Sequence, residues 1–503
     1  MQSQKILFVV VFRLIKFSLG FIFFYIAILF YIPHIIGLVQ VAIAFVAIFS
    51  FIFNLRFDVA HLKIYPEEEN KAACIGAIFL FKFLSILIAF IFYFSFLFFF
   101  EFDIVLTILI IIFVFEQITQ SLNNGFMNML VADGEMIKSQ FPWLINSASR
   151  ILFLVLGVLF FELNEFTLAI AYILSTLIHF FVLIIYMLPY KISKPNKYLL
   201  RKYLKYTYPL SILTIVTLIS TNIGFILINF WISTEAVAFY YVGDHLTEFK
   251  SIIPNIIILI MIPIFSRNVK ANKFEKNKQI IKKVSKYSCL LFGIIIMLSF
   301  LYSDELIIIF IGKTYTQSIF IFNILILAQI IYINDIAVYA DLNARGLTKL
   351  YSILNIIGES YSIFLIILFV SPQGLNLGIN GVALAMLFRH ATLSPILRFY
   401  LWKRYTYGYN FEIFIFIISA FCIYLINLFL FSNVNLLIFF YLIPILSIIN
   451  IIFYFGILYL FRILKKEDLR YIKLMLNVKS LIKLLYSDLV LKKGKNDTNN
   501  SKY

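Results

Sequence analysis

The sequence contains few charged residues and few cysteines. Charged residues make up 13% of its 503 positions, which is about half of their share in an average soluble protein. The three cysteines, Cys74, Cys289 and Cys422, lie far apart in apolar segments, so we expect neither a disulfide framework nor a metal site. A Walker-type glycine loop is also missing, which argues against ATP hydrolysis by this chain. We expect no cofactor.

Apolar residues, by contrast, are abundant. Hydrophobic residues make up 63% of the sequence and the mean hydropathy is +0.99, so a soluble protein, with about 45–50% apolar residues, is excluded. About fourteen segments reach the roughly 20 residues that a transmembrane helix needs. These predicted spans cover residues 7–31, 35–58, 73–99, 104–130, 141–161, 166–189, 207–231, 236–266, 287–303, 317–341, 349–370, 379–402, 411–431 and 436–461. The sequence therefore predicts an all-α integral membrane protein.

Lysine and arginine fall almost entirely in alternate loops between these spans. One set of loops is rich in them, as at 190–206 and 267–286, whereas the other set is acidic and holds a single cation, Lys313. Positively charged loops remain in the cytoplasm, so we predict that both termini are cytoplasmic and that the number of spans is even. The net charge of +17 resides in these inner loops and the tail, which favours anionic lipid headgroups over nucleic acid as the counter-surface.

Internal similarity predicts two lobes of six helices. LVADGEMIKSQ (130–140) ends span four and LNARGLTKLYS (342–352) ends span ten, at a constant offset of 212 residues. Parallel repeats about an axis along the membrane normal are a known transporter plan. We predict an N-lobe with a basic linker (1–206), a C-lobe (207–409), two extra C-terminal helices (410–461) and a basic cytoplasmic tail (462–503). Within the tail, residues 464–490 have the periodicity of a helix on the inner membrane surface, or form a solvated charged segment.

Basic side chains within the predicted spans are too numerous to be matched by isolated acids. A charged group at the centre of a span costs roughly 2.5–3.5 kcal/mol on insertion scales, so each one requires an explanation. Arg13 could extend back to the inner surface, whereas Lys16 lies deeper in the same span. The basic residues in question are Arg13, Lys16, Lys82, Arg150, Lys250 and Arg389. We predict that they line a water-filled cavity, which implies an anionic substrate.

Acidic residues accompany these cations. Glu116, Asp244, Glu248 and Glu359 lie within spans, and His245 adjoins Glu248 at a helical spacing. Such a group could bind protons or a cation, and so couple transport to an ion gradient. It could equally be neutralised by the basic residues of neighbouring spans.

The chain resembles the polysaccharide flippases of the multidrug/oligosaccharidyl-lipid/polysaccharide exporter superfamily over about residues 1–461. The segments that carry this resemblance are loose patterns: YIPHIIGLVQVAIAF (31–45), FNLRFDVAHLK (53–63), the two Ala-x-Gly segments at 130–140 and 342–352, and LGINGVALAM (377–386). The resemblance implies a MATE-like fold in the bacterial inner membrane.

The resemblance also implies a function. Such proteins move undecaprenyl-diphosphate-linked sugar repeat units outward for surface polysaccharides such as O-antigen and lipopolysaccharide, by alternating access and without catalysing a reaction. In the related lipid II flippases, cations on spans one, two and eight meet the diphosphate; the matching residues here are Arg13, Lys16, Arg56 and Lys250. Arg56 departs from that pattern because it lies at the cytoplasmic end of its span, and Lys250 replaces an arginine. A polysaccharide polymerase and a chain-length regulator are implied as partners.

Other functions remain open from the sequence. A multidrug exporter of the same fold usually handles organic cations, which require acidic rather than basic cavities. An O-antigen polymerase or membrane glycosyltransferase would need carboxylates or arginines on long outer loops, whereas Glu101 and Asp103 lie in a loop of only a few residues. An amino-acid or ion transporter of another family would explain the topology but not the number of cations.

Overall fold

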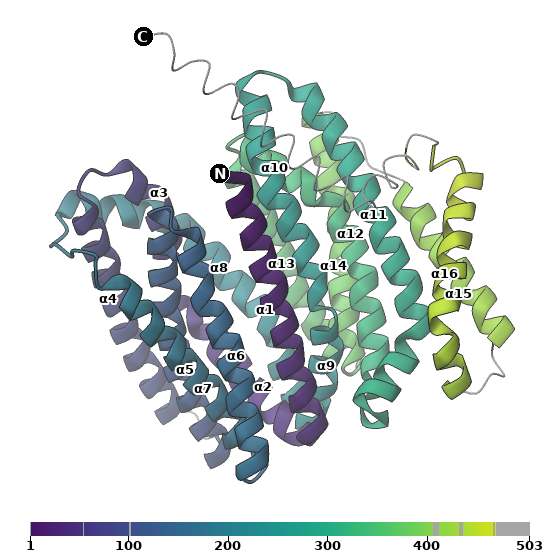
Figure 1. Cartoon of the computed structure of the whole chain (residues 1–503), viewed down its shortest axis with the longest axis horizontal. Coiled ribbons are helices and arrows are strands. Elements are labelled where there is room, and N and C mark those ends of the chain that lie inside the picture. Colours follow the sequence, from purple (N-terminus) through teal and green to yellow (C-terminus); the bar gives the residue numbers. More distant parts are fainter. Residues whose placement is uncertain are drawn as a thin grey trace.

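The computed structural model describes residues 2–53, 55–99, 102–405, 412–431, 436–465 and 468, which form helices and connecting turns without any strand (Figure 1). The helices of the first half are α1 (Gln2–Phe30), α2 (Pro33–Phe49), η1 (Ser50–Ile52), α3 (Phe57–Glu67), α4 (Lys71–Phe99), α5 (Ile104–Ala132), α6 (Met136–Phe160), α7 (Glu165–Met187) and α8 (Lys197–Trp231). Those of the second half are α9 (Thr234–Leu246), η2 (Glu248–Ser251), α10 (Ile252–Lys270), α11 (Phe274–Glu305), η3 (Leu306–Ile311), η4 (Lys313–Tyr315), α12 (Ser318–Ala344), α13 (Thr348–Val370), α14 (Asn380–Tyr405), α15 (Glu412–Phe431) and α16 (Leu436–Leu460). The helix predicted for residues 464–490 lies outside the described residues, apart from its first positions and Asp468.

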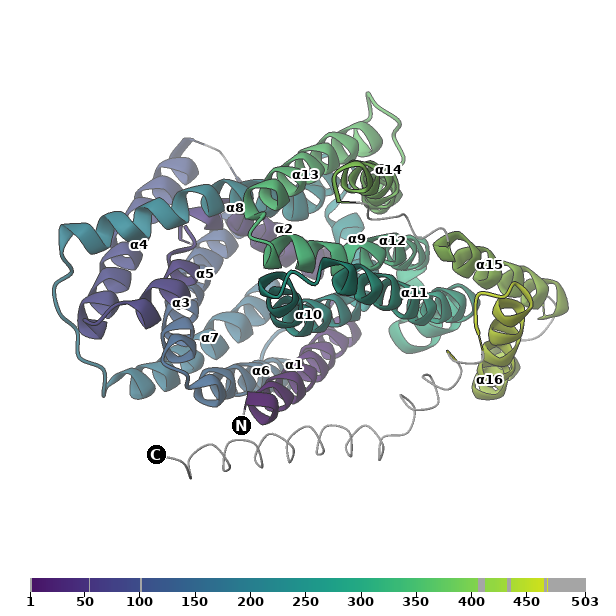
Figure 2. The ribbon, with the colours of Figure 1, turned by 90° about the horizontal axis from the view of Figure 1, so that it is seen from above.

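The helices pack into two bundles (Figures 1 and 2). In the N-terminal bundle, which we define as α1–α7, α6 contacts α1 and α7, and α5 contacts α3 and α7. In the C-terminal bundle, defined as α8–α14, α12 is central and contacts α9, α10, α11, α13 and α14. α2 joins the bundles because it packs against α8 and α9 as well as α5, and α15 and α16 lie against α11 at the edge of the C-terminal bundle.

Thirteen helical segments of the described chain are long and apolar enough to cross a membrane, and the protein is a multi-pass membrane protein. The predicted span at 379–402 is the one that is not among them, although it forms the continuous helix α14. This helix carries Arg389, His390 and Arg398, which lower its hydropathy. The number of spans and the cytoplasmic location of the termini therefore stay predictions.

Two predicted spans are interrupted in the structure. Span two, predicted as one helix over 35–58, consists of α2, η1 and α3, and Arg56 has a φ of 57° where α3 begins. Span eight, predicted over 236–266, is divided by η2 between α9 and α10. The sequence favours Pro254 and Pro263 as hinges, but the interruption precedes both. Pro254 lies in the first turn of α10, where its missing N–H is not needed.

Two helices extend beyond their predicted spans. α8 includes residues 197–206 of the predicted basic linker, because the Asn196 side chain accepts a hydrogen bond from the Leu199 N–H at 2.7 Å and caps the first turn. α11 likewise includes residues 274–286 of the long basic loop. The predicted lobe boundary at residue 206 thus falls inside a continuous helix, and the lobe ranges stay a prediction.

The repeated Ala-x-Gly segments have the same backbone geometry. Gly134 after α5 has a φ of 85° and Gly346 after α12 has a φ of 76°. In each turn a backbone N–H reaches back to the last turn of the helix, from Glu135 to the Leu130 carbonyl at 2.8 Å and from Leu347 to the Leu342 carbonyl at 3.0 Å. This is the Schellman ending that favours glycine. The two Ala-x-Gly segments therefore end their helices in the same way.

Candidate functional site

Two basic side chains of the N-terminal bundle lie over aromatic rings rather than beside carboxylates. Lys16 on α1 places its Nζ 3.4 Å from the centre of a Trp143 ring on α6. Arg150 on α6 lies 4.4 Å from the Tyr172 ring and donates from Nε to the Ser175 hydroxyl at 3.2 Å. Among the described residues, neither cation forms an ion pair. Their positive charge is held in place but not neutralised.

These cations act on one another across helices. Arg150, Glu248 and Arg13 all interact electrostatically with Lys16. Arg13 on α1 is exposed and, like Lys16, has no ion-pair partner among the described residues. We call Arg13, Lys16 and Arg150 the cationic group. The group brings together predicted site residues of α1 and α6, and Glu248 of the C-terminal bundle is the acid whose charge acts on Lys16.

Glu116 and the aromatic neighbours complete the surroundings of Arg150. Glu116 on α5 accepts a hydrogen bond from the Thr176 hydroxyl at 2.9 Å. It also interacts electrostatically with Arg150, although the two form no ion pair among the described residues. The His179 ring lies 5.0 Å from Trp143. Sequence reasoning missed Trp143, although a signal was available: it precedes Arg150 by seven residues and so shares its face of the helix.

Lys250 and Arg389, the predicted site cations of the C-terminal bundle, are neutralised within that bundle. Lys250 contacts Asp244 at 2.8 Å and also donates to the Thr247 hydroxyl at 2.7 Å. Arg389 makes two hydrogen bonds to Glu359, at 2.8 and 2.5 Å. The sequence left open whether these acids bind protons or are neutralised by basic residues. In the structure, Asp244 and Glu359 are neutralised.

Arg398 on α14 is paired in the same way. Its place near the end of its predicted span favours an extension to the inner surface. Instead it is 3% exposed and donates from Nε to Asp335 at 2.5 Å.

Lys82 and Arg56 occupy places apart from the cationic group. Lys82 is 3% exposed and donates to the Ser121 hydroxyl at 2.8 Å and to the Phe53 carbonyl at 3.3 Å, so in this conformation it is enclosed by its own bundle. Arg56 is exposed at the interruption of span two and donates from Nε to the Thr214 hydroxyl on α8 at 2.7 Å. It connects the two bundles rather than joining Lys16.

The interruption in span eight contacts α1. His245, at the end of α9, lies 4.2 Å from the Phe24 ring of α1. Its Nδ1 is 3.3 Å from a Glu248 carboxylate oxygen, and Glu248 begins η2. The predicted acidic cluster is thus divided, because Asp244 binds Lys250 while Glu248 and His245 lie beside α1.

The bundles meet closely at the predicted outer end, where α2 and α9 begin. His34 Nδ1 lies 2.9 Å from a Glu235 carboxylate oxygen. Hydrogen bonds, first from its own backbone and then from His34, hold the pKa of Glu235 below its usual value. Nearby, a Cβ on Gly37 would lie 1.9 Å from the Thr234 carbonyl oxygen, so only glycine permits this approach of the two helices.

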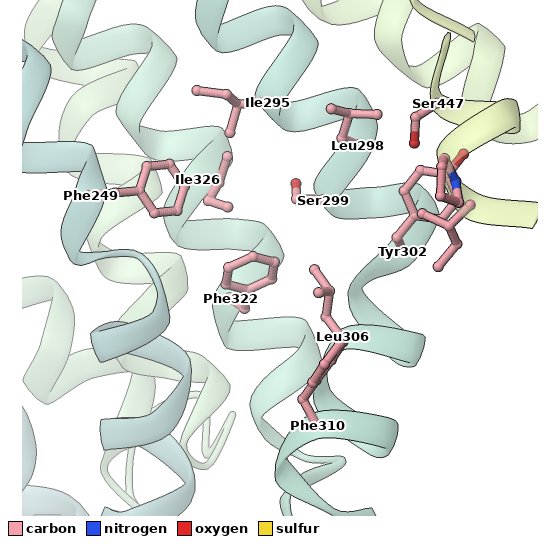
Figure 3. A pocket seen from close by; sticks show the side chains of 12 residues that line it. Phe249, Ile295, Leu298, Ser299, Tyr302, Leu306, Phe310, Phe322, Ile326 and Ser447 are labelled. Carbon is pink, nitrogen blue, oxygen red and sulfur yellow. The ribbon is translucent and has the colours of Figure 1, made fainter. Parts of the chain in front are cut away.

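An apolar pocket opens beside η2 (Figure 3). It has a volume of about 730 Å³ and lies between η2, α11, α12 and α16. Phe249, Leu298, Leu306, Phe310, Phe322 and Ile326 form much of its wall, and Ser447 of α16 contributes one of few polar groups. Phe249 directly follows Glu248 in the chain, so the pocket adjoins the acid that faces the cationic group. The pocket could take an alkyl or prenyl chain.

Comparisons with known proteins agree on family and fold. A family model described as polysaccharide biosynthesis protein matches residues 3–269, which is more than half of the chain. No curated protein matches the sequence. The structure of a lipid II flippase, MurJ, in an inward closed conformation is similar with a TM-score of 0.74 and 16% identity, over 91% of this chain and 100% of that one.

Drug transporters share the same architecture. An inward-facing multidrug resistance MATE transporter of the MOP superfamily is similar with a TM-score of 0.63 and 13% identity, over 77% of this chain and 93% of that one. A MOP superfamily transporter from Pyrococcus furiosus gives a TM-score of 0.57 and 13% identity, over 80% of this chain and 95% of that one. At these identities the likeness shows the fold alone. It confirms the predicted all-α, MATE-like membrane fold.

Proposed function

Because the chain belongs to the polysaccharide biosynthesis protein family, we propose that it is a flippase for undecaprenyl-diphosphate-linked oligosaccharide repeat units. It moves them from the inner to the outer leaflet of the bacterial inner membrane for surface polysaccharide synthesis, and it catalyses no reaction. The observation that carries this proposal is the cationic group, whose charges have no carboxylate partner among the described residues.

The charge of the substrate explains why such a group is needed. A diphosphate cannot cross about 30 Å of hydrocarbon unaided, because an unpaired ion in an apolar medium is very costly. Lys250 and Arg389 are already paired with carboxylates, so they would attract a further anion only weakly. Lys16 and Arg150 keep their charge available, and their aromatic neighbours position them without competing for it.

The lipid part of the substrate requires a different surface. The apolar pocket beside η2 adjoins Glu248 and is walled by aliphatic and phenylalanine side chains. With a volume of about 730 Å³, it accommodates a segment of a prenyl chain while the remainder stays in the bilayer. In this proposal the diphosphate and the beginning of the tail are held on opposite sides of η2.

The energy source belongs to the proposal as well. Asp244 and Glu359 are occupied by Lys250 and Arg389, whereas Glu116, His245 and Glu248 are not held by lysine or arginine among the described residues. We therefore place proton or ion coupling at these three positions. A polysaccharide polymerase and a chain-length regulator are the proposed partners that receive the product.

A reconstituted flipping assay tests the proposal. Liposomes containing the purified protein receive a labelled undecaprenyl-diphosphate oligosaccharide, and an impermeant probe reports the leaflet that holds the label. We expect protein-dependent loss of label asymmetry, and its abolition in Lys16→Ala and Arg150→Ala at unchanged protein content. Absence of movement with several such lipids, together with uptake of organic cations under an ion gradient, would instead assign the chain to the drug-exporter function.

A further inference from the structure

Among the described residues, Glu248 lies where the C-terminal bundle faces α1 and has no lysine or arginine partner. Lys250 and Arg389 take Asp244 and Glu359 as partners. The ion-pair partner of Glu248 among the described residues is the neighbouring His245, and its side chain is 55% exposed. The N-terminal bundle instead has unpaired positive charge, because the cationic group has no carboxylate partner among the described residues of that bundle.

The position of Glu248 is determined by the interruption of span eight. Glu248 is the first residue of η2. The turn is held on one side by the contact of Lys250 with Asp244 at 2.8 Å, and on the other by Gln329 of α12, which donates to the Lys250 carbonyl at 2.9 Å. The backbone that carries Glu248 is therefore fixed to α9 and α12.

Contacts across the bundles place this acid opposite the cations. His245, which is 3.3 Å from Glu248, lies 4.2 Å from the Phe24 ring of α1. The adjoining Phe23 ring is 5.8 Å from the Arg150 guanidinium. Glu248 is also the acid whose charge acts on Lys16.

We propose that Glu248 is a tethered counter-anion for Lys16 and Arg150, and that the diphosphate of the substrate displaces it. In the empty protein its carboxylate partly balances the cationic group and draws η2 towards α1. An arriving diphosphate supplies more negative charge to the same cations and repels Glu248. Since Glu248 is fixed to η2, substrate binding changes the interaction between the bundles at the interruption of span eight. This inference rests on the proposed function.

The competition is measurable with inorganic pyrophosphate as the probe. Its binding to the purified full-length protein in lipid nanodiscs is followed by calorimetry. Glu248→Gln removes the negative charge that acts on Lys16, so it is expected to tighten binding about fivefold. Glu248→Ala is expected to change the affinity in the same direction, and Glu248→Asp to keep the wild-type affinity. Glu162→Gln, which removes an exposed acid at the predicted outer end, serves as the matched control and leaves the affinity unchanged.

Transport separates the counter-anion from a merely neighbouring charge. In the flipping assay, Glu248→Gln is expected to lower the substrate concentration for half-maximal rate and also to lower the maximal rate, because release becomes harder. If Lys16→Ala loses pyrophosphate binding while Glu248→Gln binds as the wild type does, the flippase proposal stands and the counter-anion is overturned. Weaker binding by Glu248→Gln also overturns it. If neither the wild type nor Glu248→Gln binds pyrophosphate, the anion site fails as well.

Discussion

The charged residues within the bundles fall into two kinds that differ in how their burial is compensated. Arg389 with Glu359, and Arg398 with Asp335, are hydrogen-bonded ion pairs inside the C-terminal bundle. Such pairs contribute little net stability, but removing one partner leaves a buried uncompensated charge. Lys16 over Trp143 is of the other kind, since a cation–π contact orients a cation without cancelling its charge. Only a cation held in this way keeps its charge available to a ligand.

The Trp143 ring is expected to support the function of Lys16. In Trp143→Leu the contact at 3.4 Å is lost, and cation–π contacts contribute about 0.5–2 kcal/mol. The substrate concentration for half-maximal flipping should therefore rise about twofold to thirtyfold, with abundance unchanged. Trp402→Leu is the matched control, because Trp402 is exposed and far along the chain on α14. Equal kinetics in the two variants would argue against a role for the ring.

The Arg389–Glu359 pair is expected to be structural. Arg389→Met should lower stability by about 3–5 kcal/mol, because it strands Glu359 in a buried site. The double variant Arg389→Met/Glu359→Met removes both charges and should recover most of the loss. Thermal unfolding of the detergent-solubilised proteins checks this. If the stability loss of the double variant equals the sum of the losses in Arg389→Met and Glu359→Met, the two side chains do not interact as described.

The charged residues were predictable from the sequence as a set, but their partners were not. Lys82 and Lys16 look alike in hydropathy, yet Lys82 is enclosed by Ser121 and the Phe53 carbonyl whereas Lys16 meets Trp143. Partners on other helices depend on packing, which periodicity does not report. Spacing along one helix indicated the contact of His245 with Glu248, and it could also have pointed to Trp143, which lies on the same face of α6 as Arg150.

At the scale of helices, the interruptions in spans two and eight are stabilised from neighbouring spans. After η1, the Phe53 carbonyl accepts hydrogen bonds from both Lys82 and Ser121. In η2, the Lys250 carbonyl accepts one from Gln329. A buried carbonyl that leaves the helical pattern must find another donor, and these donors come from distant parts of the chain. Continuous hydropathy therefore predicted unbroken helices.

Gly37 is expected to govern closure between α2 and α9. In Gly37→Ala the added Cβ would meet the Thr234 carbonyl at 1.9 Å, so the helices must separate at the predicted outer end. A Val41→Cys probe on α2, buried at 4% exposure, should then react faster with an impermeant thiol reagent added outside. The background carries Cys422→Ser, since Cys74 and Cys289 are buried.

Gly20→Ala is the matched control for this experiment. A Cβ at Gly20 has no neighbour within 4 Å, so labelling of the probe should match that of the parent protein. Unchanged labelling in Gly37→Ala, with normal transport and abundance, would mean that the α2–α9 contact tolerates a side chain and does not close the protein.

At the scale of the whole molecule, the bundles are closed at the predicted outer end. The His34–Glu235 pair and the Gly37 contact lie there. The membrane fold and the superfamily could be predicted from alternating loop charge and a few loose motifs, because topology follows from composition along the chain. The closure at this end could not be predicted, since it depends on the contact between His34 and Glu235, which are 201 positions apart in the sequence.

Locking this contact is expected to stop transport reversibly. In His34→Cys/Glu235→Cys, a short bis-methanethiosulfonate reagent forms a disulfide with each cysteine, releases methanesulfinate at each end and so bridges α2 and α9, whose wild-type side chains lie 2.9 Å apart. Alternating access requires the outer end to open, so flipping should cease after cross-linking and return after reduction. Each single-cysteine variant is the control. Undiminished flipping by fully cross-linked protein would exclude opening at this end.

The measurement that tests the central claim most directly compares two charge removals in the same flipping assay. One protein carries Lys16→Ala/Arg150→Ala, and the other carries the neutral pair removal Arg389→Met/Glu359→Met. The unneutralised cations of the N-terminal bundle are proposed to carry the diphosphate, so the first variant should lose flipping of the undecaprenyl-diphosphate oligosaccharide at normal abundance while the second retains it. Normal flipping by the first variant, or loss confined to the second, would contradict this assignment.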